Sequence, residues 1–170
     1  MPADNHGGTT GLGTVTVDSR RLCRRRPLRG EPAAAEVSPL LQAGDASLTA
    51  VGLGEVIDHL VRLVGADEEA AVRDVAQLGL LDAMAVDSRI CAAAGRLRAR
   101  HYHRIRCSVS MADCIAAETA RHTKDALVRS DPHLLDVSHA EGIGLVGLPG
   151  SDGSRWLGRP DVAFRLICDR

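Results

Sequence analysis

The stretch ALVRSDPHLLDVSHAEGIGLVGL, residues 126–148, decides the fold. Its opening run, residues 126–129, is short and mostly apolar, which is typical of a buried strand. Asp131 followed by a proline is a strong signal for the start of a helix, which we expect to run to about Glu141. A second apolar run, residues 143–148, predicts another strand. Since a strand, a helix and a strand in this order give two parallel strands, the chain is predicted to be an α/β protein.

Short apolar runs alternate with longer helical segments along the rest of the chain as well. Three further strands are predicted upstream, in a β-branched run that ends at Asp18 and in residues 47–51 and 81–86. The spacing of apolar residues and the presence of capping residues predict helices over residues 53–64, 67–78, 87–103 and 110–122. The whole pattern predicts a mainly parallel sheet of about five strands covered by helices.

Length and composition fit one globular domain. The 170 residues are 45% hydrophobic and 25% charged, with a formal net charge of −1. This suffices for one sizeable core, and no apolar run reaches the roughly 18 residues that cross a bilayer. We expect a flexible lead-in over residues 1–13, a folded domain over residues 14–149 and a tail of unknown structure over residues 150–170. Five scattered cysteines and a polar N-terminus without an apolar signal core predict a reducing, cytoplasmic location.

Basic residues are almost all arginine, and they gather in two groups. One group lies within residues 19–29, where the first crossover helix is expected but where there is almost no apolar face. The other lies within residues 96–106, with His101 and His103 between the arginines. This second group is interpreted either as a contact for RNA phosphates, independent of base sequence, or as an ordinary solvated helix face. For the two histidines we expect a solvated helix end.

Four acidic residues are predicted to meet at the carboxyl edge of the sheet, where open α/β sheets place their sites. They are Asp18 at the end of the first strand, Glu55 in the first turn of the helix after the second, Asp113 in the first turn of a later helix and Asp131 directly after the fourth strand. Two carboxylates about 4 Å apart repel by roughly 4 kcal/mol at an effective dielectric near 20, so such a cluster needs neutralising. Protonation would achieve this, but oxygen ligands with open positions are also what Mg²⁺ or Mn²⁺ prefers. A plain structural role stays open too, because Asp113 and Asp131 would cap helices.

Several motifs stand in the order and at the spacing of a known family. They are TVTVD ending in Asp18, LTAVGLGEVIDHLVR around Glu55, SVSMADC around Asp113 and SDPHLLDVSHAEGI around Asp131. With them, residues 14–149 resemble the PIN-domain nucleases, particularly the VapC-like toxins of bacterial toxin–antitoxin pairs. The resemblance implies a three-layer α/β/α fold in which the four acids are the catalytic and metal-binding residues. It further implies Mg²⁺- or Mn²⁺-dependent endoribonuclease cleavage of RNA, restrained by a small antitoxin, in a chain expected to form a homodimer.

Three features depart from the family pattern. Gly52 stands where the family usually has Asn, and Arg129 stands where Ser or Thr is common. Arg129 is interpreted as a side chain that either forms an ion pair with Asp131, in competition with a metal, or points elsewhere. Residues 19–29 replace an apolar helix that in the family often belongs to the antitoxin or dimer surface. An alternative therefore stays open, in which the chain is a catalytically impaired PIN-like module that binds an antitoxin or RNA.

Overall fold

The computed structural model describes residues 15–17 and 32–158 of the chain. Four strands within these ranges form one parallel sheet in the order β2-β1-β3-β4. They are β1 (Val15–Val17), β2 (Ala46–Ser47), β3 (Ala126–Arg129) and β4 (Leu145–Gly147). The predicted α/β class is confirmed. Asp18, residues 1–14, residues 19–31 and residues 159–170 lie outside the described part, so what the sequence predicts for them stays a prediction.

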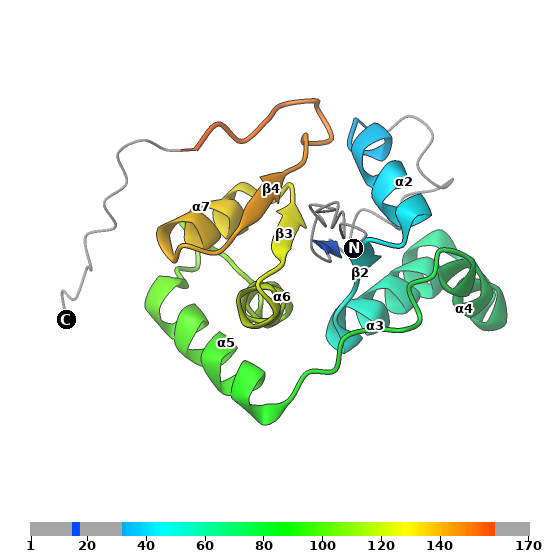
Figure 1. Cartoon of the computed structure of the whole chain (residues 1–170), viewed down its shortest axis with the longest axis horizontal. Coiled ribbons are helices and arrows are strands. Elements are labelled where there is room, and N and C mark those ends of the chain that lie inside the picture. Colours follow the sequence, from blue (N-terminus) through cyan, green and yellow to red (C-terminus); the bar gives the residue numbers. More distant parts are fainter. Residues whose placement is uncertain (1–14, 18–31, 159–170) are drawn as a thin grey trace, which may run out of the picture.

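Helices join the strands and cover the sheet (Figure 1). They are α2 (Ala34–Ala43), α3 (Ala50–His59), α4 (Glu68–Gln77), α5 (Ser88–His101), α6 (Met111–Thr123) and α7 (Pro132–Ala140), and a turn of π-helix, η1 (Leu60–Val64), continues α3. Five helices begin at a residue whose side chain accepts a backbone N–H of the first turn, namely Thr49, Asp67, Asp87, Ser110 and Asp131. Such caps satisfy donors that a helix start leaves unpaired. No helix in the described part is long and apolar enough to cross a membrane.

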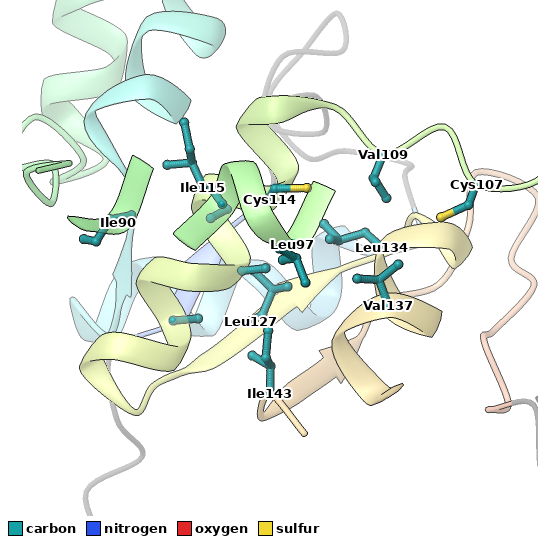
Figure 2. Close-up of a cluster of buried hydrophobic side chains, with 14 residues drawn as sticks. Ile90, Leu97, Cys107, Val109, Cys114, Ile115, Leu127, Leu134, Val137 and Ile143 are labelled. Carbon is teal, nitrogen blue, oxygen red and sulfur yellow. The ribbon is translucent and has the colours of Figure 1, made fainter. Parts of the chain in front are cut away.

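Strand β3 contributes to two hydrophobic cores, one on each face of the sheet. Leu127 packs with residues of α5, α6 and α7 in the cluster that Figure 2 shows, and Val128 packs with residues of α2, α3 and α4. Neither side chain is exposed to solvent. Successive side chains of a strand point to opposite faces, so burying both requires helices on both sides. Figure 1 shows these two groups of helices on either side of β3, which confirms the predicted layers.

The strand predicted over residues 47–51 is wrong in its second half. Strand β2 ends at Ser47, and α3 already begins at Ala50. The cause is Thr49, whose hydroxyl oxygen accepts the backbone N–H of Gly52 at 3.0 Å. This local cap outweighs the strand preference of the β-branched residues around it.

Residues 81–86, predicted as a strand, pair with the sheet at one residue only. Met84 forms an isolated parallel bridge with Thr49, in which the Met84 N–H donates to the Leu48 carbonyl at 2.7 Å. Leu81 is 44% exposed, so its side chain does not pack in the core. The start of this apolar run therefore does not extend the pairing into a strand. In place of a fifth strand, the described residues thus have four strands and the isolated Thr49–Met84 bridge.

Helix α2 was not among the predicted helices. Pro39 lies inside it, and proline is ordinarily a signal against a helix because it lacks the backbone N–H. Tertiary packing holds the helix in place, since Val37 is only 3% exposed and Leu40 packs against the same core. Gly44 ends the helix in the left-handed conformation, with φ of 73°.

The beginning of the predicted tail lies against two helices. The indole N–H of Trp156 donates to the Asp136 carboxylate of α7 at 2.8 Å, and the Trp156 ring packs edge-on against His139. Arg155 forms an ion pair with Glu36 of α2. Residues 150–158 therefore connect α7 with α2.

Glu141 joins the C-terminal ends of α5, α6 and α7. Its carboxylate pairs with His101 at 2.6 Å, with Arg100 at 2.8 Å and with Arg121 at 3.0 Å. Only 11% of the His101 side chain is exposed, so the solvated helix end expected for this histidine is wrong. Burial alone would raise the pKa of Glu141, but the hydrogen bonds from His101, Arg100 and Arg121 outweigh it and hold this pKa at about 2, below the ordinary 4.5.

Replacing Glu141 by Gln is expected to destabilise the protein in a pH-dependent way. Because the pKa of Glu141 is lowered on folding, its carboxylate stabilises the fold above pH 4.5 and loses this effect as the pH falls towards 2. The shift corresponds to an upper figure of about 3 kcal/mol at neutral pH. Urea unfolding should give the largest difference between wild type and Glu141→Gln at pH 7, with the difference shrinking below pH 4.5.

A matched control is Glu69→Gln, which removes an acid that is 89% exposed and pairs only along its own helix with Arg73. Such surface pairs contribute little to stability, so this variant should unfold like wild type throughout the titration. A Glu141→Gln difference that stays constant from pH 7 to pH 3 would contradict the role assigned to the cluster.

Candidate functional site

Asp113 lies in the first turn of α6 and forms a capping box with Ser110. The backbone N–H of Asp113 donates to the Ser110 hydroxyl oxygen at 3.0 Å. In return, the Ser110 N–H and hydroxyl donate to Oδ2 of Asp113 at 2.9 and 2.7 Å. Within the described residues, Oδ1 accepts no hydrogen bond. The predicted capping role is confirmed, and it uses only one of the two carboxylate oxygens.

Asp131 is the N-cap of α7, directly beyond β3. Its Oδ1 accepts the backbone N–H of Leu134 at 2.9 Å, and its other oxygen accepts no hydrogen bond from the described part of the chain. Asp131 is exposed, whereas Arg129 is only 4% exposed. Asp131 is held by its own helix cap, and competition between Arg129 and a metal for this carboxylate stays a prediction.

Glu55 lies in the second turn of α3, one turn further along than predicted, because α3 already begins at Ala50. It is half-buried, and α3 packs against α6, the helix that carries Asp113. Near the start of α3, a Cβ added at Gly52 would lie 3.3 Å from the Thr49 hydroxyl oxygen. A side chain at this position would therefore crowd the Thr49 cap, which would have to shift by a few tenths of an ångström.

Two buried cysteines connect the starts of α6 and α7. Cys107 and Cys114 pack in one hydrophobic cluster with Leu134, as Figure 2 shows. Burial raises the pKa of the Cys107 thiol, and the charge of Asp131 raises it further. Burial likewise raises the pKa of Cys114 to about 12, with an added effect from Asp113. Because Cys114 lies near the start of α6 and Leu134 near the start of α7, the shared cluster packs these two helix starts on the same core.

The described residues do not form a complete metal site by themselves. Among residues 15–17 and 32–158, no three His, Cys, Asp or Glu side chains lie close enough together to hold a metal ion. The fourth predicted ligand, Asp18, lies outside these residues. The donor chemistry nonetheless fits a hard cation: Asp113 and Asp131 each keep an oxygen without a hydrogen bond within this part of the structure. A thiol with a pKa of about 12, such as Cys114, stays protonated and is a poor ligand.

Arg98 belongs to the arginine group of residues 96–106, but its contacts are structural ones that support the start of α6. The Nε–H of Arg98 donates to the Val109 carbonyl at 3.2 Å, one residue before the Ser110 cap. Its guanidinium lies 4.0 Å from the ring centroid of Tyr102. The i,i+4 spacing of Arg98 and Tyr102 was visible in the sequence and could have indicated this stacking.

Comparisons with known proteins agree with this architecture. The family model "PIN domain" matches residues 26–140, a range that includes Glu55, Asp113 and Asp131 but not Asp18. The structure of FitAB bound to an IR36 DNA fragment is similar, with a TM-score of 0.60, 14% sequence identity, and 79% of this chain and 94% of that chain covered. FitAcB from Neisseria gonorrhoeae is similar too, with a TM-score of 0.57, 13% identity, and coverage of 79% and 97%. At such low identity these two structures show the fold alone. No curated protein matches the chain.

Proposed function

Because the chain belongs to the PIN-domain family, we propose that it is the toxin of a toxin–antitoxin pair and acts as a Mg²⁺- or Mn²⁺-dependent endoribonuclease. The observation that supports the proposal is that the starts of α6 and α7, each with an aspartate in a capping role, pack on one buried cluster, and that Asp131 lies just beyond the carboxyl end of β3. One carboxylate oxygen of Asp113 and one of Asp131 accept hydrogen bonds at the start of their own helix, which fixes both side chains. Within the described residues the other oxygen of each accepts no hydrogen bond and could bind a cation.

Asp18, Glu55, Asp113 and Asp131 are the proposed catalytic and metal-binding residues. We include Asp18 because it follows Val17, the last residue of β1, and β1 lies between β2 and β3 in the sheet. When bound, a divalent cation would supply Lewis acidity that activates a water and offsets charge developing on the phosphate. The chain's own part is to fix the carboxylates: the capping bonds hold Asp113 and Asp131, and the packing of α3 on α6 brings in the helix of Glu55.

The proposed partners are an RNA substrate, a small antitoxin that binds near the site and a second copy of the chain. They rest on the resemblance of the motifs to VapC-like toxins. The FitAB structure, which is similar in fold, is bound to DNA, so DNA belongs in any test of the substrate. A cytoplasmic location is proposed as well, because a toxin of this kind would meet its RNA there.

Purified protein should cleave single-stranded RNA when Mg²⁺ or Mn²⁺ is added, and cleavage should stop with EDTA or in Asp18→Asn. Products would be separated on denaturing gels, with DNA of the same sequence in parallel lanes. Divalent metal should also raise the melting temperature of wild type more than that of Asp18→Asn, because it relieves carboxylate repulsion only in the complete cluster. Cleavage that survives EDTA would remove the proposal. Retention of RNA without cleavage would favour the impaired binding module.

A further inference from the structure

The structure sorts the arginines of residues 96–106 by what they contact. Arg98 is held by the Val109 carbonyl and stacks on Tyr102. Arg100 forms an ion pair with Glu141 at 2.8 Å. These two have structural partners. Arg96, Arg104 and Arg106 are exposed, and none of them forms an ion pair within the described part of the chain; Arg96 lies within α5, whereas Arg104 and Arg106 follow this helix.

Arg104 and Arg106 lie on a tight loop, residues 103–107, whose backbone is well braced. The N–H of His103 donates to the Cys107 carbonyl at 2.9 Å, and the N–H of Cys107 donates back to the His103 carbonyl at 3.0 Å. The Nδ1 atom of His103 accepts the N–H groups of Ile105 at 3.2 Å and Arg106 at 3.0 Å. A loop fixed in this way presents its exposed side chains in one place, at a low entropic cost for binding.

The loop lies beside the starts of α6 and α7, the helices whose first turns involve Asp113 and Asp131. Cys107, only 5% exposed, anchors it in the cluster that contains Leu134, whose backbone N–H donates to Asp131 (Figure 2). Three residues further along, Ser110 caps α6 together with Asp113. The loop is thus anchored in the cluster that holds the start of α7 and leads directly into the start of α6.

We propose that residues 103–107 bind the backbone of single-stranded RNA beside the candidate site, with Arg104 and Arg106 on its phosphates. Ile105, between them and 82% exposed, contacts the ribose or base of the same strand and loses its costly contact with water. The role of these residues as a substrate contact rests on the proposed ribonuclease function; their binding of RNA does not.

Phosphate contacts of this kind have a characteristic salt dependence. Each phosphate neutralised on a single strand adds about 0.7 to the slope of log affinity against log salt concentration. Two contacts therefore account for a slope of about 1.4. The contribution should be nearly the same for RNAs of different sequence, because phosphates carry no base information.

The test is binding of a fluorescently labelled single-stranded RNA in EDTA, where no divalent metal is present to support cleavage. The double variant Arg104→Gln/Arg106→Gln is expected to bind about tenfold more weakly at low salt, with the salt slope reduced by about 1.4. The matched control is Arg62→Gln/Arg73→Gln, which removes the same charge from two exposed helix pairs with Asp58 and Glu69. The control should bind RNA like wild type.

Two outcomes would overturn the proposal: unchanged affinity in the loop variant, or an equal loss in the control, which would mean that only net charge matters. The loop variant should melt like wild type, because Arg104 and Arg106 hold no ion pair in the described structure. The control should melt within a few degrees of wild type, because it removes only two exposed i,i+4 pairs, which contribute little. The nuclease proposal fails separately. If wild type does not cleave RNA with Mg²⁺ but the loop variant still binds RNA more weakly than the control, RNA binding by residues 103–107 is supported and the nuclease proposal is rejected.

Discussion

Asp113→Asn is expected to slow RNA cleavage by about 100-fold or more while leaving the melting temperature nearly unchanged. Loss of a metal-binding carboxylate costs several kcal/mol of transition-state stabilisation, and about 3 kcal/mol already corresponds to about 100-fold. The fold is spared because the Asn carbonyl oxygen can still accept the two Ser110 hydrogen bonds that now reach Oδ2. Initial cleavage rates with Mg²⁺ and thermal melting would be measured on the same preparations.

Asp67→Asn is the matched control, because Asp67 caps α4 in the same manner by accepting the N–H groups of Glu69 and Ala70 at 3.1 Å. Removing this charge should not change the cleavage rate. Asp131→Asn should behave like Asp113→Asn, since Asn is an equally good N-cap for the Leu134 N–H. Equal rates in Asp113→Asn and Asp67→Asn would exclude Asp113 from the chemistry.

Leu127→Ala is expected to destabilise the protein by about 2–5 kcal/mol, the largest effect on folding that we predict. Leu127 is fully buried in β3 and packs in the cluster formed with α5, α6 and α7. Truncating it removes apolar burial and leaves a cavity, because helices held on both sides of β3 cannot close the gap. The free energy of unfolding in urea would be compared with that of wild type at neutral pH.

The control for this change is Leu157→Ala, the same truncation at a side chain that is 92% exposed. It should alter the free energy of unfolding by less than about 0.5 kcal/mol. If Leu127→Ala were as mild as Leu157→Ala, the centre of the sheet would not be packed as described.

The starts of most helices were predictable because their signals are local. Asp67, Asp87, Ser110 and Asp131 each accept a backbone N–H two or three residues further along, and this chemistry needs no knowledge of the rest of the fold. The same locality identified Asp113 and Asp131 as candidates for the site. The strands β3 and β4 were also found, because they flank a helix with a clear start.

Features that depend on distant partners could not be predicted. His101 is largely buried and pairs with Glu141, forty residues away, which also binds Arg121. Helix α2 persists around Pro39 only because a core exists for it to pack on. For the candidate site, the approach of the helix starts that carry Asp113 and Asp131 depends on packing of distant segments in the cluster of Cys107, Cys114 and Leu134, which no spacing rule encodes. The place of Asp18 stays a prediction.

The capping roles of Asp113 and Asp131 affect which substitutions would be tolerated at these positions if the activity were lost in evolution. Asp131 caps α7 and Asp113 completes the capping box of α6, and under the proposed function each would also offer an oxygen to a metal. A lineage that no longer needed the reaction would still be selected for a folded chain, so substitutions at Asp131 should favour Asn or Ser, which preserve the helix start, over Leu or Val, which do not. A descendant of this chain that had lost the proposed activity would then carry neutral polar residues in place of Asp113 and Asp131.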